Sequence, residues 1–463
     1  MQIALFCPFV HWPAHFATDL ELAFDHRAAG DAVTMLACDG ELPVCDVNLA
    51  HNPGWCDICV KRRGRGERLL PEGVVVEPLL RHLPAGAQVP SFPHFANRHE
   101  LAAYQLDGFD IGAAAFSSLV MLLRDPDPDL DRHAESLRDL LTTAYLVHTA
   151  MGAYLDTHHV DRVYVFNPRF SSTRGVLRAS TRRGVPCIAH EVGADLTRYA
   201  LYPNVFPHDR AHANRDIDNL WNAEDDAVRR ELGARYYRDK IVGIETYGNS
   251  FVAGHQPGLL PPGWDPAKRN IVAFTSSEDE YLALGPEWEN PIYPNELTAV
   301  QEIVRSLADA PEDVHLFVRV HPNLTGIDCS QTRGLRALDH PRVTVIPAES
   351  PVSTYAMLRE AWKIVTFGST VGIEAVFWGI PSVLAGIAWY GDLGGTYNPA
   401  THEEVMALLG ADLAPKDPLP ALKYGLFSAR FGTPYRHYRA TSRDGGEFRG
   451  VDVWYRDDLE NNA

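Results

Sequence analysis

This chain of 463 residues is poor in basic residues and has no long apolar run. It holds 42 Lys and Arg residues against 60 Asp and Glu residues, which gives a formal net charge of −18. Such a balance argues against broad binding to nucleic acid or to anionic lipid surfaces, although local groups can still hold one small nucleotide. No uninterrupted apolar stretch reaches the length of about 18 residues that a membrane-spanning helix requires.

Cysteine is also scarce, with seven residues in the whole chain. An odd number of cysteines in a large chain favours reduced thiols over a disulfide framework. The first residues, MQIALF, carry no basic leader, so we expect them to form a core strand rather than a signal peptide. We therefore expect a cytoplasmic protein that makes at most peripheral contact with the inner face of the membrane.

The order of apolar segments is typical of an α/β protein. Strand patterns alternate with helical patterns, and the expected strands are 2–6, 32–36, 163–166 and 186–189 in the first half and 270–274, 315–320, 343–346, 363–367 and 382–384 in the second. This alternation predicts parallel sheets covered by helices, and the length suits two large domains. We expect two Rossmann-like, doubly wound domains that face a central cleft.

The domain boundary is expected within 240–268, where GHQPGLLPPGWDP concentrates Pro and Gly. The expected domains are residues 1–245, with a cysteine-rich loop at 38–59, and residues 246–415. Residues 416–463 have no strong strand pattern but carry many aromatic residues, which need a surface to cover them. We expect this C-terminal segment to return to the first domain.

Four of the seven cysteines lie close together in the sequence, at Cys38, Cys45, Cys56 and Cys59. Four thiolates satisfy a closed tetrahedral zinc site, and a C-x2-C pair can place two of them on one metal. The same residues are also compatible with free thiols, with a redox pair or with an iron–sulfur cluster. A structural zinc site is therefore one of several interpretations of this loop.

The segment KIVTFGSTVGIEAV joins an expected strand to an expected helix through Gly368, Ser369 and Thr370. Small residues let a ligand approach the backbone, and hydroxyls at a helix start can bind a phosphate. Glu374, about one turn further along, would then reach the ribose attached to that phosphate. Alternatively, Ser369 or Thr370 only caps the helix and Glu374 is a favourable acid in its first turn.

Two other expected strands end in groups that suit a phosphate. The segment VRVHP places Arg319 and His321 at the end of one strand, and Ser276 and Ser277 follow another. Arginine and histidine donate strong hydrogen bonds to phosphate oxygens. Carboxyl ends of parallel strands meet at one edge of a sheet, where α/β proteins bind their ligands. Three such strand ends in one domain favour a nucleotide site.

The order strand-TSS, R-x-HP, SP-x-S and GST-x-G-x-EA…G-x-P resembles the donor-nucleotide domain of bacterial capsule-polysaccharide-type glycosyltransferases. The similarity covers roughly 270–395 and is thinner over 163–209, where HEVGADLTRYALYPNVFPHD is similar to the middle segment of such proteins. This resemblance implies the GT-B architecture. It makes 246–415 the domain that binds the nucleotide-sugar donor and 1–245 the domain that binds the acceptor.

The resemblance also carries over to individual positions. It implies that His321 contacts the nucleotide phosphates, that Glu374 holds the ribose, and that the turn at 350–355 lies near the nucleobase. The full set of donor-binding residues that it implies is Ser276, Ser277, Arg319, His321, Pro322, Ser350, Ser353, Gly368, Ser369, Thr370 and Glu374.

Sugar transfer also needs a base for the acceptor hydroxyl and a group that stabilises the leaving phosphate. Glu191 is the first candidate for the base and His190 the second, while His321 would act on the leaving phosphate. Alternatively, Glu191 and His190 are loop groups that bind acceptor hydroxyls or make structural hydrogen bonds. The candidate acceptor-binding residues are Arg169, Asp195 and Arg198. For the two arginines, the alternative is a solvated or salt-bridged surface group. The expected cleft segments lack a convincing D-x-D motif, so we expect catalysis without a cofactor or an essential divalent metal.

The expected reaction moves a sugar or sugar acid from a UDP- or CMP-type donor to a hydroxyl of a polysaccharide or glycolipid. A non-hydrolysing UDP-sugar 2-epimerase and a non-catalytic nucleotide-binding scaffold are alternatives that use similar elements. A teichoic-type polyol-phosphate transferase shares the nucleotide side. The sequence does not distinguish among sugars, acceptors, anomeric outcomes or oligomeric states.

Overall fold

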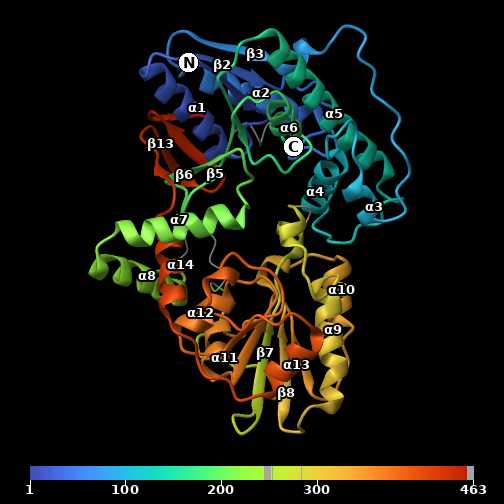
Figure 1. Ribbon diagram of the computed structural model, residues 1–463, viewed down its shortest axis with the longest axis vertical. Coiled ribbons are helices and arrows are strands. Elements are labelled where there is room, and N and C mark those ends of the chain that lie inside the picture. The colour runs from blue at the N-terminus through green and yellow to red at the C-terminus, as the bar shows by residue number, and fades with distance from the viewer. Residues whose placement is uncertain (245–251, 253, 283, 456–463) are drawn as a thin grey trace. The chain divides into compact units, whose positions relative to one another are not determined.

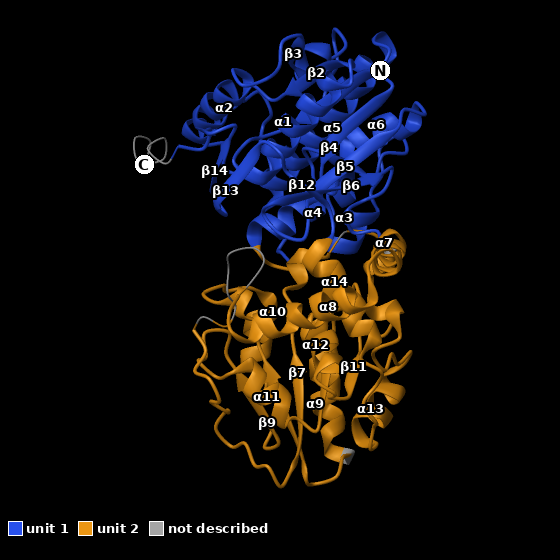
Figure 2. Ribbon diagram, turned by 90° about the vertical axis from the view of Figure 1, so that its left-hand side faces the viewer, with its two compact units in different colours: residues 1–123, 127–209, 431–463 blue, residues 124–126, 210–430 orange. Residues whose placement is uncertain are grey.

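The computed structural model describes residues 1–244, 252, 254–282 and 284–455 (Figure 1). The chain divides into two compact units (Figure 2). Unit 1 is built from residues 1–123, 127–209 and 431–463, and unit 2 from residues 124–126 and 210–430. Each unit contains a largely parallel sheet, which confirms the predicted α/β class. The predicted cleft between the two sheets stays a prediction.

The main sheet of unit 1 has seven strands in the order β12-β6-β5-β4-β1-β2-β3. Its parallel strands are β1 (Gln2–Cys7), β2 (Ala32–Ala37), β3 (Val74–Pro78), β4 (Arg162–Phe166) and β5 (Cys187–Val192). Strands β6 (Arg198–Pro203) and β12 (Thr433–Pro434) extend it by antiparallel pairing. The parallel strands wind outwards from β1 in both directions, which is the doubly wound arrangement.

Helices cover both faces of this sheet, and their bounds are α1 (Pro13–Ala28), α2 (Pro53–Glu67), α3 (Arg98–Ala103), α4 (Ile111–Leu123), α5 (Ala134–Thr157) and α6 (Arg174–Arg182). Alternate residues of a strand point to opposite faces. Leu5 of β1 therefore packs in the cluster that contains Phe16 of α1, whereas Phe6 packs in the cluster that contains Met151 of α5. In the described part of the chain, no helix is both long enough and apolar enough to cross a membrane.

The sheet of unit 2 has five parallel strands in the order β11-β10-β7-β8-β9. Their bounds are β7 (Arg269–Phe274), β8 (Val314–Arg319), β9 (Val343–Ile346), β10 (Lys363–Thr366) and β11 (Ser382–Leu384). The helices of this unit are α7 (Arg210–Ala223), α8 (Asp226–Ile241), α9 (Glu296–Ser306), α10 (Ser330–Arg336), α11 (Thr354–Glu360), α12 (Val371–Phe377), α13 (His402–Gly410) and α14 (Leu419–Arg430). The strand order again winds outwards from the first strand, β7.

Two segments lie in a different unit from the one that the sequence predicts. Helices α7 and α8, expected in the first domain, are part of unit 2. The reason is their packing on α14, because Gly233 and Gly425 have no side chains and let α8 and α14 approach to backbone contact. The C-terminal segment 416–463 divides at residue 430, so that α14 stays in unit 2 and the chain from Phe431 onwards is in unit 1.

The part of the C-terminal segment in unit 1 is anchored by aromatic side chains. It forms a small sheet of β13 (Tyr438–Ser442), β14 (Gly445–Phe448) and β15 (Val451–Asp452). Trp454 is 1% exposed, and its indole N–H donates to the carbonyl of Val10 at 2.8 Å. The Tyr435 hydroxyl lies 2.8 Å from the carbonyl oxygen of Ala14 on α1.

A testable consequence concerns the contact between α8 and α14. Tyr237 is fully buried, and its hydroxyl donates to the carbonyl of Ala421 at 2.6 Å. The Tyr237→Phe variant leaves that buried carbonyl without its donor, so we expect a loss of about 1 kcal/mol in the free energy of unfolding. Urea unfolding followed by tryptophan fluorescence measures it. An unchanged midpoint would contradict the contribution assigned to this hydrogen bond.

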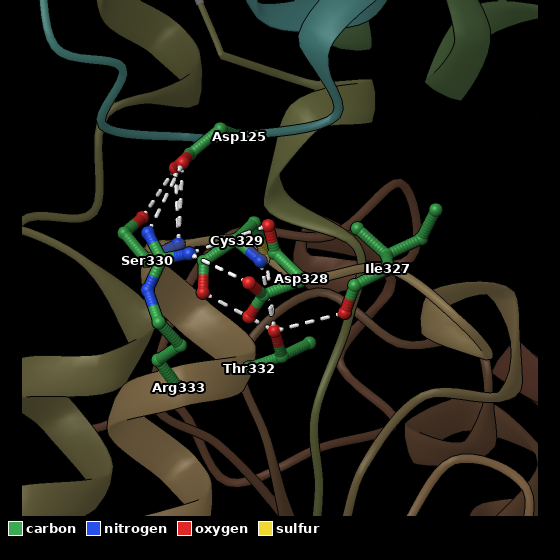
Figure 3. A network of polar contacts seen from close by, with 7 residues as sticks. All are labelled: Asp125, Ile327, Asp328, Cys329, Ser330, Thr332 and Arg333. Atoms are coloured by element: carbon green, nitrogen blue, oxygen red, sulfur yellow. Dashed lines mark hydrogen bonds and ion pairs between the residues drawn. The ribbon is translucent and has the colours of Figure 1, made fainter.

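The short segment 124–126 belongs to unit 2 because its acidic and basic side chains bind there. The Asp125 carboxylate accepts from the Ser330 backbone N–H at the start of α10, at 3.2 and 3.3 Å, and from the Ser330 hydroxyl (Figure 3). Arg124 donates through Nε to Asp279 at 2.8 Å and through Nη2 to the carbonyl of Asn323 at 3.1 Å. These contacts hold the turn that follows β8.

Candidate functional site

A pocket in unit 2 lies at the carboxyl ends of β7, β8 and β10. It is lined by Lys240, Val252, His255, Phe274, Thr275, Arg319, His321, Pro322, Thr354, Tyr355, Ser369, Thr370, Val371 and Glu374. Six of these residues were predicted as donor-binding residues from the sequence, namely Arg319, His321, Pro322, Ser369, Thr370 and Glu374. Parallel strands bring these distant sequence positions to one edge of the sheet.

His321 lies two residues after the end of β8, and hydrogen bonds hold both its backbone and its ring. Its backbone N–H donates to the Thr275 hydroxyl at 3.0 Å, and its ring Nδ1 accepts from the Asn323 backbone N–H at 3.1 Å. Burial lowers the pKa of His321 to about 4, so the ring is neutral at neutral pH. Since Nδ1 accepts a hydrogen bond, the ring proton resides on Nε2, which makes that nitrogen a donor.

Glu374 on α12 is 3% exposed and accepts hydrogen bonds from side chains of three different segments. Its Oε1 accepts from Lys240 Nζ at 2.8 Å and from the Thr370 hydroxyl at 3.2 Å, and its Oε2 accepts from the Tyr355 hydroxyl at 2.8 Å. Burial opposes the charge of Lys240, but the Glu374 carboxylate outweighs it and holds the pKa of Lys240 well above its usual value. The pocket therefore contains a cation that the sequence analysis did not identify.

Arg319 reaches the pocket, but its guanidinium group binds protein groups. It is 1% exposed and donates to the carbonyls of Pro347 at 2.6 Å and Ser350 at 3.1 Å, while Nη2 lies 2.9 Å from His255 Nε2. Burial lowers the pKa of Arg319 to about 10, so the group is still charged at neutral pH. These contacts hold the turn at 347–350 and differ from the bidentate phosphate contact predicted from the sequence.

The predicted serines at the other strand ends do not line the pocket. Ser276 donates to the buried Glu296 carboxylate, and Ser277 donates to Asp279, so both organise the loop after β7. Thr275, one residue earlier, lines the pocket instead. Alternation along an extended chain explains this difference, because neighbouring residues point in opposite directions.

The predicted serines of the turn at 350–355 also have structural roles. The Ser353 hydroxyl accepts from the Ala356 backbone N–H at 3.1 Å and so caps α11, and the Ser350 hydroxyl accepts from the Val352 backbone N–H. The next residues on α11, Thr354 and Tyr355, line the pocket. Gly368 is close-packed, because a Cβ there would lie 3.2 Å from the carbonyl oxygen of Ile387.

In unit 1, the two candidate bases have different environments. His190 is 0% exposed, and its Nε2 lies 3.0 Å from Asp19 Oδ1, which gives it a structural contact in the core. The Glu191 side chain is 26% exposed, with Oε1 3.5 Å from His15 Nε2 and with Oε2 accepting from Asn167 Nδ2 at 2.8 Å. Burial raises the pKa of Glu191 above its usual value and lowers that of His15.

The three predicted acceptor-binding residues all make structural contacts. Arg169 is 7% exposed and lies over the Phe170 ring at 4.4 Å. Asp195 accepts from the Thr197 backbone N–H at 2.8 Å, and Arg198 donates to the carbonyl of Gly432 at 2.9 Å. The contact of Arg198 joins β6 to the chain entering β12. None of these contacts indicates an acceptor.

The four clustered cysteines line a second pocket, which lies in unit 1. Among the residues that the structure describes, no group of three or more His, Cys, Asp or Glu side chains is placed to hold a metal ion. The structure therefore does not support the predicted zinc ion at Cys38, Cys45, Cys56 and Cys59.

Comparison with known families finds one match, to the family described as "Capsule polysaccharide biosynthesis protein", over residues 291–413. This stretch includes His321, the turn at 350–355, the Gly368–Thr370 segment and Glu374. The match confirms the family resemblance that these motifs predict. A search of curated proteins finds no match.

The chain also has distant similarity to solved structures. The β-Kdo 2,4 transferase of Thermosulfurimonas dismutans KpsC is 17% identical, with a TM-score of 0.38 over 57% of this chain and 79% of that chain. The β-Kdo 2,7 transferase of the same protein is 16% identical, with a TM-score of 0.37 over 59% and 77%. A Methanocaldococcus jannaschii UDP-GlcNAc 2-epimerase is 10% identical, with a TM-score of 0.29 over 92% and 98%. At such low identities and TM-scores, these likenesses carry no functional argument.

Proposed function

We propose that this protein is a glycosyltransferase that moves a sugar or sugar acid from a UDP- or CMP-type nucleotide donor to a hydroxyl of a polysaccharide or glycolipid. The observation that carries the proposal is the pocket of unit 2. It gathers the His321 Nε2–H donor, the hydroxyls of Ser369 and Thr370, and the Lys240 cation at the carboxyl edge of a parallel sheet. Most of these groups lie in the segment that matches the capsule polysaccharide family.

The pocket supplies what a leaving nucleotide phosphate requires. Negative charge develops on the phosphate oxygen as the glycosyl bond breaks, and preorganised donors stabilise that charge. His321 donates through Nε2, and the Ser369 hydroxyl, which accepts from the Val371 backbone N–H, can donate beside it. The Thr370 hydroxyl donates to Glu374 and can donate to the phosphate only after it turns away from that carboxylate. Lys240 adds a positive charge. We propose that these protein groups suffice and that no divalent metal or cofactor is required in the pocket.

Glu374 has two roles in this proposal. Each carboxylate oxygen has two lone pairs, and Oε1 already accepts from Lys240 and Thr370. Oε2, which accepts from Tyr355, has a lone pair left for one ribose hydroxyl. It also positions Lys240 through the 2.8 Å ion pair. Loss of Glu374 should therefore weaken nucleotide binding through both the ribose and the displaced cation.

For the acceptor side, we propose Glu191 as the base that takes the proton of the acceptor hydroxyl. A raised carboxylate pKa brings a base closer to the operating pH and makes it more effective. His15 and Asn167 hold the carboxylate in place. We do not propose His190 as the base, because its ring is buried against Asp19.

A thermal-shift panel of UDP, CMP, CDP, GDP and ADP tests the proposed function. A ligand that binds only the folded protein stabilises it by about 2.7 kcal/mol at 100 times its dissociation constant. We expect one pyrimidine nucleotide to raise the melting temperature more than the purine nucleotides do. If none of the five stabilises the protein at millimolar concentration, the donor site is wrongly assigned.

The Lys240→Met variant tests the cation of the pocket. We expect nucleotide affinity to fall by about 10- to 100-fold, because a hydrogen bond to a charged group contributes about 1.5–3 kcal/mol. Isothermal titration calorimetry measures the affinity. The matched control is Lys423→Met, since Lys423 pairs with Asp218 away from the pocket. Lys240→Met also leaves the Glu374 carboxylate without its cation, and the double variant Lys240→Met/Glu374→Gln separates this effect from the loss of the Lys240 charge. Unchanged affinity in Lys240→Met would contradict a role for Lys240 in nucleotide binding.

A further inference from the structure

Three residues that follow α4 leave unit 1 and contact the loops beside His321 in unit 2. Helix α4 ends at Leu123 in unit 1, residues 124–126 belong to unit 2, and the chain is part of unit 1 again from Asp127. The backbone of Arg124 has a φ of 55°, a left-handed conformation that is unfavourable for a residue with a long side chain. Such strain persists only where the surrounding contacts hold it, and it is concentrated at functional positions.

The Arg124 guanidinium joins the two loops that follow β7 and β8. It donates through Nε to Asp279 at 2.8 Å and through Nη2 to the Ser277 hydroxyl at 3.2 Å, both in the loop after β7. The same Nη2 donates to the carbonyl of Asn323 at 3.1 Å, in the turn after β8. One side chain therefore holds both loops, and arginine suits this task because its planar group fixes the directions of its donors.

Asn323 connects Arg124 to the ring of His321. Its carbonyl oxygen accepts from Arg124, and its backbone N–H donates to His321 Nδ1 at 3.1 Å. Its side-chain amide also donates to Glu280 at 2.5 Å, which adds a second link to the loop after β7. Asn323 therefore links the guanidinium of Arg124 to the nitrogen that determines which ring atom of His321 carries the proton.

Arg124 also balances a buried negative charge near the His321 ring. The Asp279 side chain is 5% exposed and forms an ion pair with Arg124. Burial is the main cause of the lowered pKa of His321, and the charged groups that act on the ring are Asp279, Arg319, Lys240 and Arg124. Of these four, Asp279 alone raises the pKa of the ring, because a nearby carboxylate favours the imidazolium. Loss of Arg124 would leave this carboxylate unbalanced and would favour a proton on Nδ1, which could then no longer accept.

We propose that Arg124 is a positioning residue for His321. It holds the turn that carries Asn323 and so keeps the imidazole oriented with Nδ1 as the acceptor and Nε2 as the donor. Asp125 anchors the same segment, because its carboxylate accepts from the backbone N–H and the hydroxyl of Ser330 at the start of α10 (Figure 3). This inference rests on the proposed function, in which the Nε2–H of His321 stabilises the leaving phosphate.

The state of the His321 ring can be measured in the full chain without any ligand. Nitrogen-15 NMR of protein labelled in its histidine rings reports the protonation of each ring nitrogen, and comparison with His321→Gln assigns the signals. In the wild type we expect a neutral ring with its proton on Nε2 from about pH 6 to 8. In Arg124→Met we expect a mixture of tautomers or partial protonation over the same interval. Unchanged His321 signals in folded Arg124→Met, or a proton on Nδ1 in the wild type, would overturn the proposal.

Further variants separate the charge of Arg124 from its hydrogen bonds. Lysine keeps a positive charge beside Asp279 but lacks the planar group, so Arg124→Lys should keep the ring neutral while both tautomers become populated. The double variant Arg124→Met/Asp279→Asn, which removes both charges, should give the same result. Far-UV circular dichroism shows whether each variant is folded, and if Arg124→Met is not, the Arg124→Lys signals decide the proposal.

The matched control is Arg333→Met. Arg333 pairs with Asp125 at 3.9 Å and with Asp328 at 3.2 Å, instead of binding the turn that carries Asn323. This variant should keep the wild-type His321 signals, and equal changes in Arg333→Met and Arg124→Met would indicate a general loosening of unit 2 and would contradict the positioning role.

Turnover provides the second readout. Arg124→Met should lower kcat by about 10-fold, because a small displacement of a catalytic group reduces the rate, while nucleotide affinity should change less. Wild-type kcat in Arg124→Met would contradict the positioning role. Failure of the proposed function has a different signature, because the wild type would then bind no nucleotide, while the NMR signals would still report whether Arg124 orients His321.

Discussion

The Glu191→Gln variant should lose about 10²- to 10⁴-fold in turnover, because the amide cannot take a proton from the acceptor hydroxyl. Glutamine keeps the shape of the side chain and can still accept from Asn167 Nδ2. The fold and the affinity for the donor nucleotide should therefore be almost unchanged. Turnover is measured with a nucleotide-sugar donor and an acceptor glycan, and nucleotide affinity is measured separately by calorimetry.

The pH profile adds a second readout for Glu191. A base works in its deprotonated form, and burial raises the pKa of this carboxyl above its usual value of 4.5. Activity should therefore fall as the pH decreases through the raised pKa, and the Glu191→Gln variant should lose this acidic limb. Glu72→Gln, which changes an exposed carboxylate of unit 1, is the matched control. Wild-type turnover and an unchanged acidic limb in Glu191→Gln would exclude Glu191 as the base.

The second large effect is expected at His321. Removal of a hydrogen-bond donor to a leaving phosphate weakens transition-state stabilisation by about 2–4 kcal/mol, or about 10²- to 10³-fold in turnover. The His321→Ala variant should show this loss in kcat. Because burial lowers the pKa of His321 to about 4, the ring is neutral from pH 6 to 8, and its contribution should not vary with pH over that interval.

A control within the same strand isolates this effect from folding. His315 also lies on β8, where its Nε2 is 2.9 Å from the Thr344 hydroxyl, and it does not line the pocket. His315→Ala should keep wild-type turnover, whereas equal losses in both variants would indicate damage to β8 instead. Incubation of the wild type with a UDP-sugar and no acceptor completes the test, because conversion of the sugar under these conditions would favour an epimerase.

Much of the pocket could be predicted from the sequence because its residues follow strand ends. The HP and GST segments come directly after apolar strand patterns, and parallel strands place such positions at one edge. His321, Ser369, Thr370 and Glu374 line the pocket for this reason. The same reasoning also predicted Ser276 and Ser277 as lining residues, but Thr275 lines the pocket instead. A strand-end pattern does not determine which residue of the following loop points towards the ligand.

Lys240 and His15 could not have been found in this way. Lys240 lies on a helix whose expected domain was the first one, and its partner Glu374 is 134 residues away in the chain. His15 follows an apolar start that carries no signal for a polar site, and it meets Glu191 only when α1 packs beside β5. The environment of each side chain depends on contacts between elements that are far apart in the sequence.

The sequence by itself determined the α/β class, the alternation of strands and helices, and the groups at the strand ends, because these depend on periodicity and on neighbours in the chain. The tertiary structure decided the rest. It assigned α7, α8 and α14 to unit 2, paired Lys240 with Glu374, and brought four cysteines from three segments to one cavity. Packing energy and electrostatic energy depend on distances in space, and distances between residues far apart in a chain are set only when the chain folds.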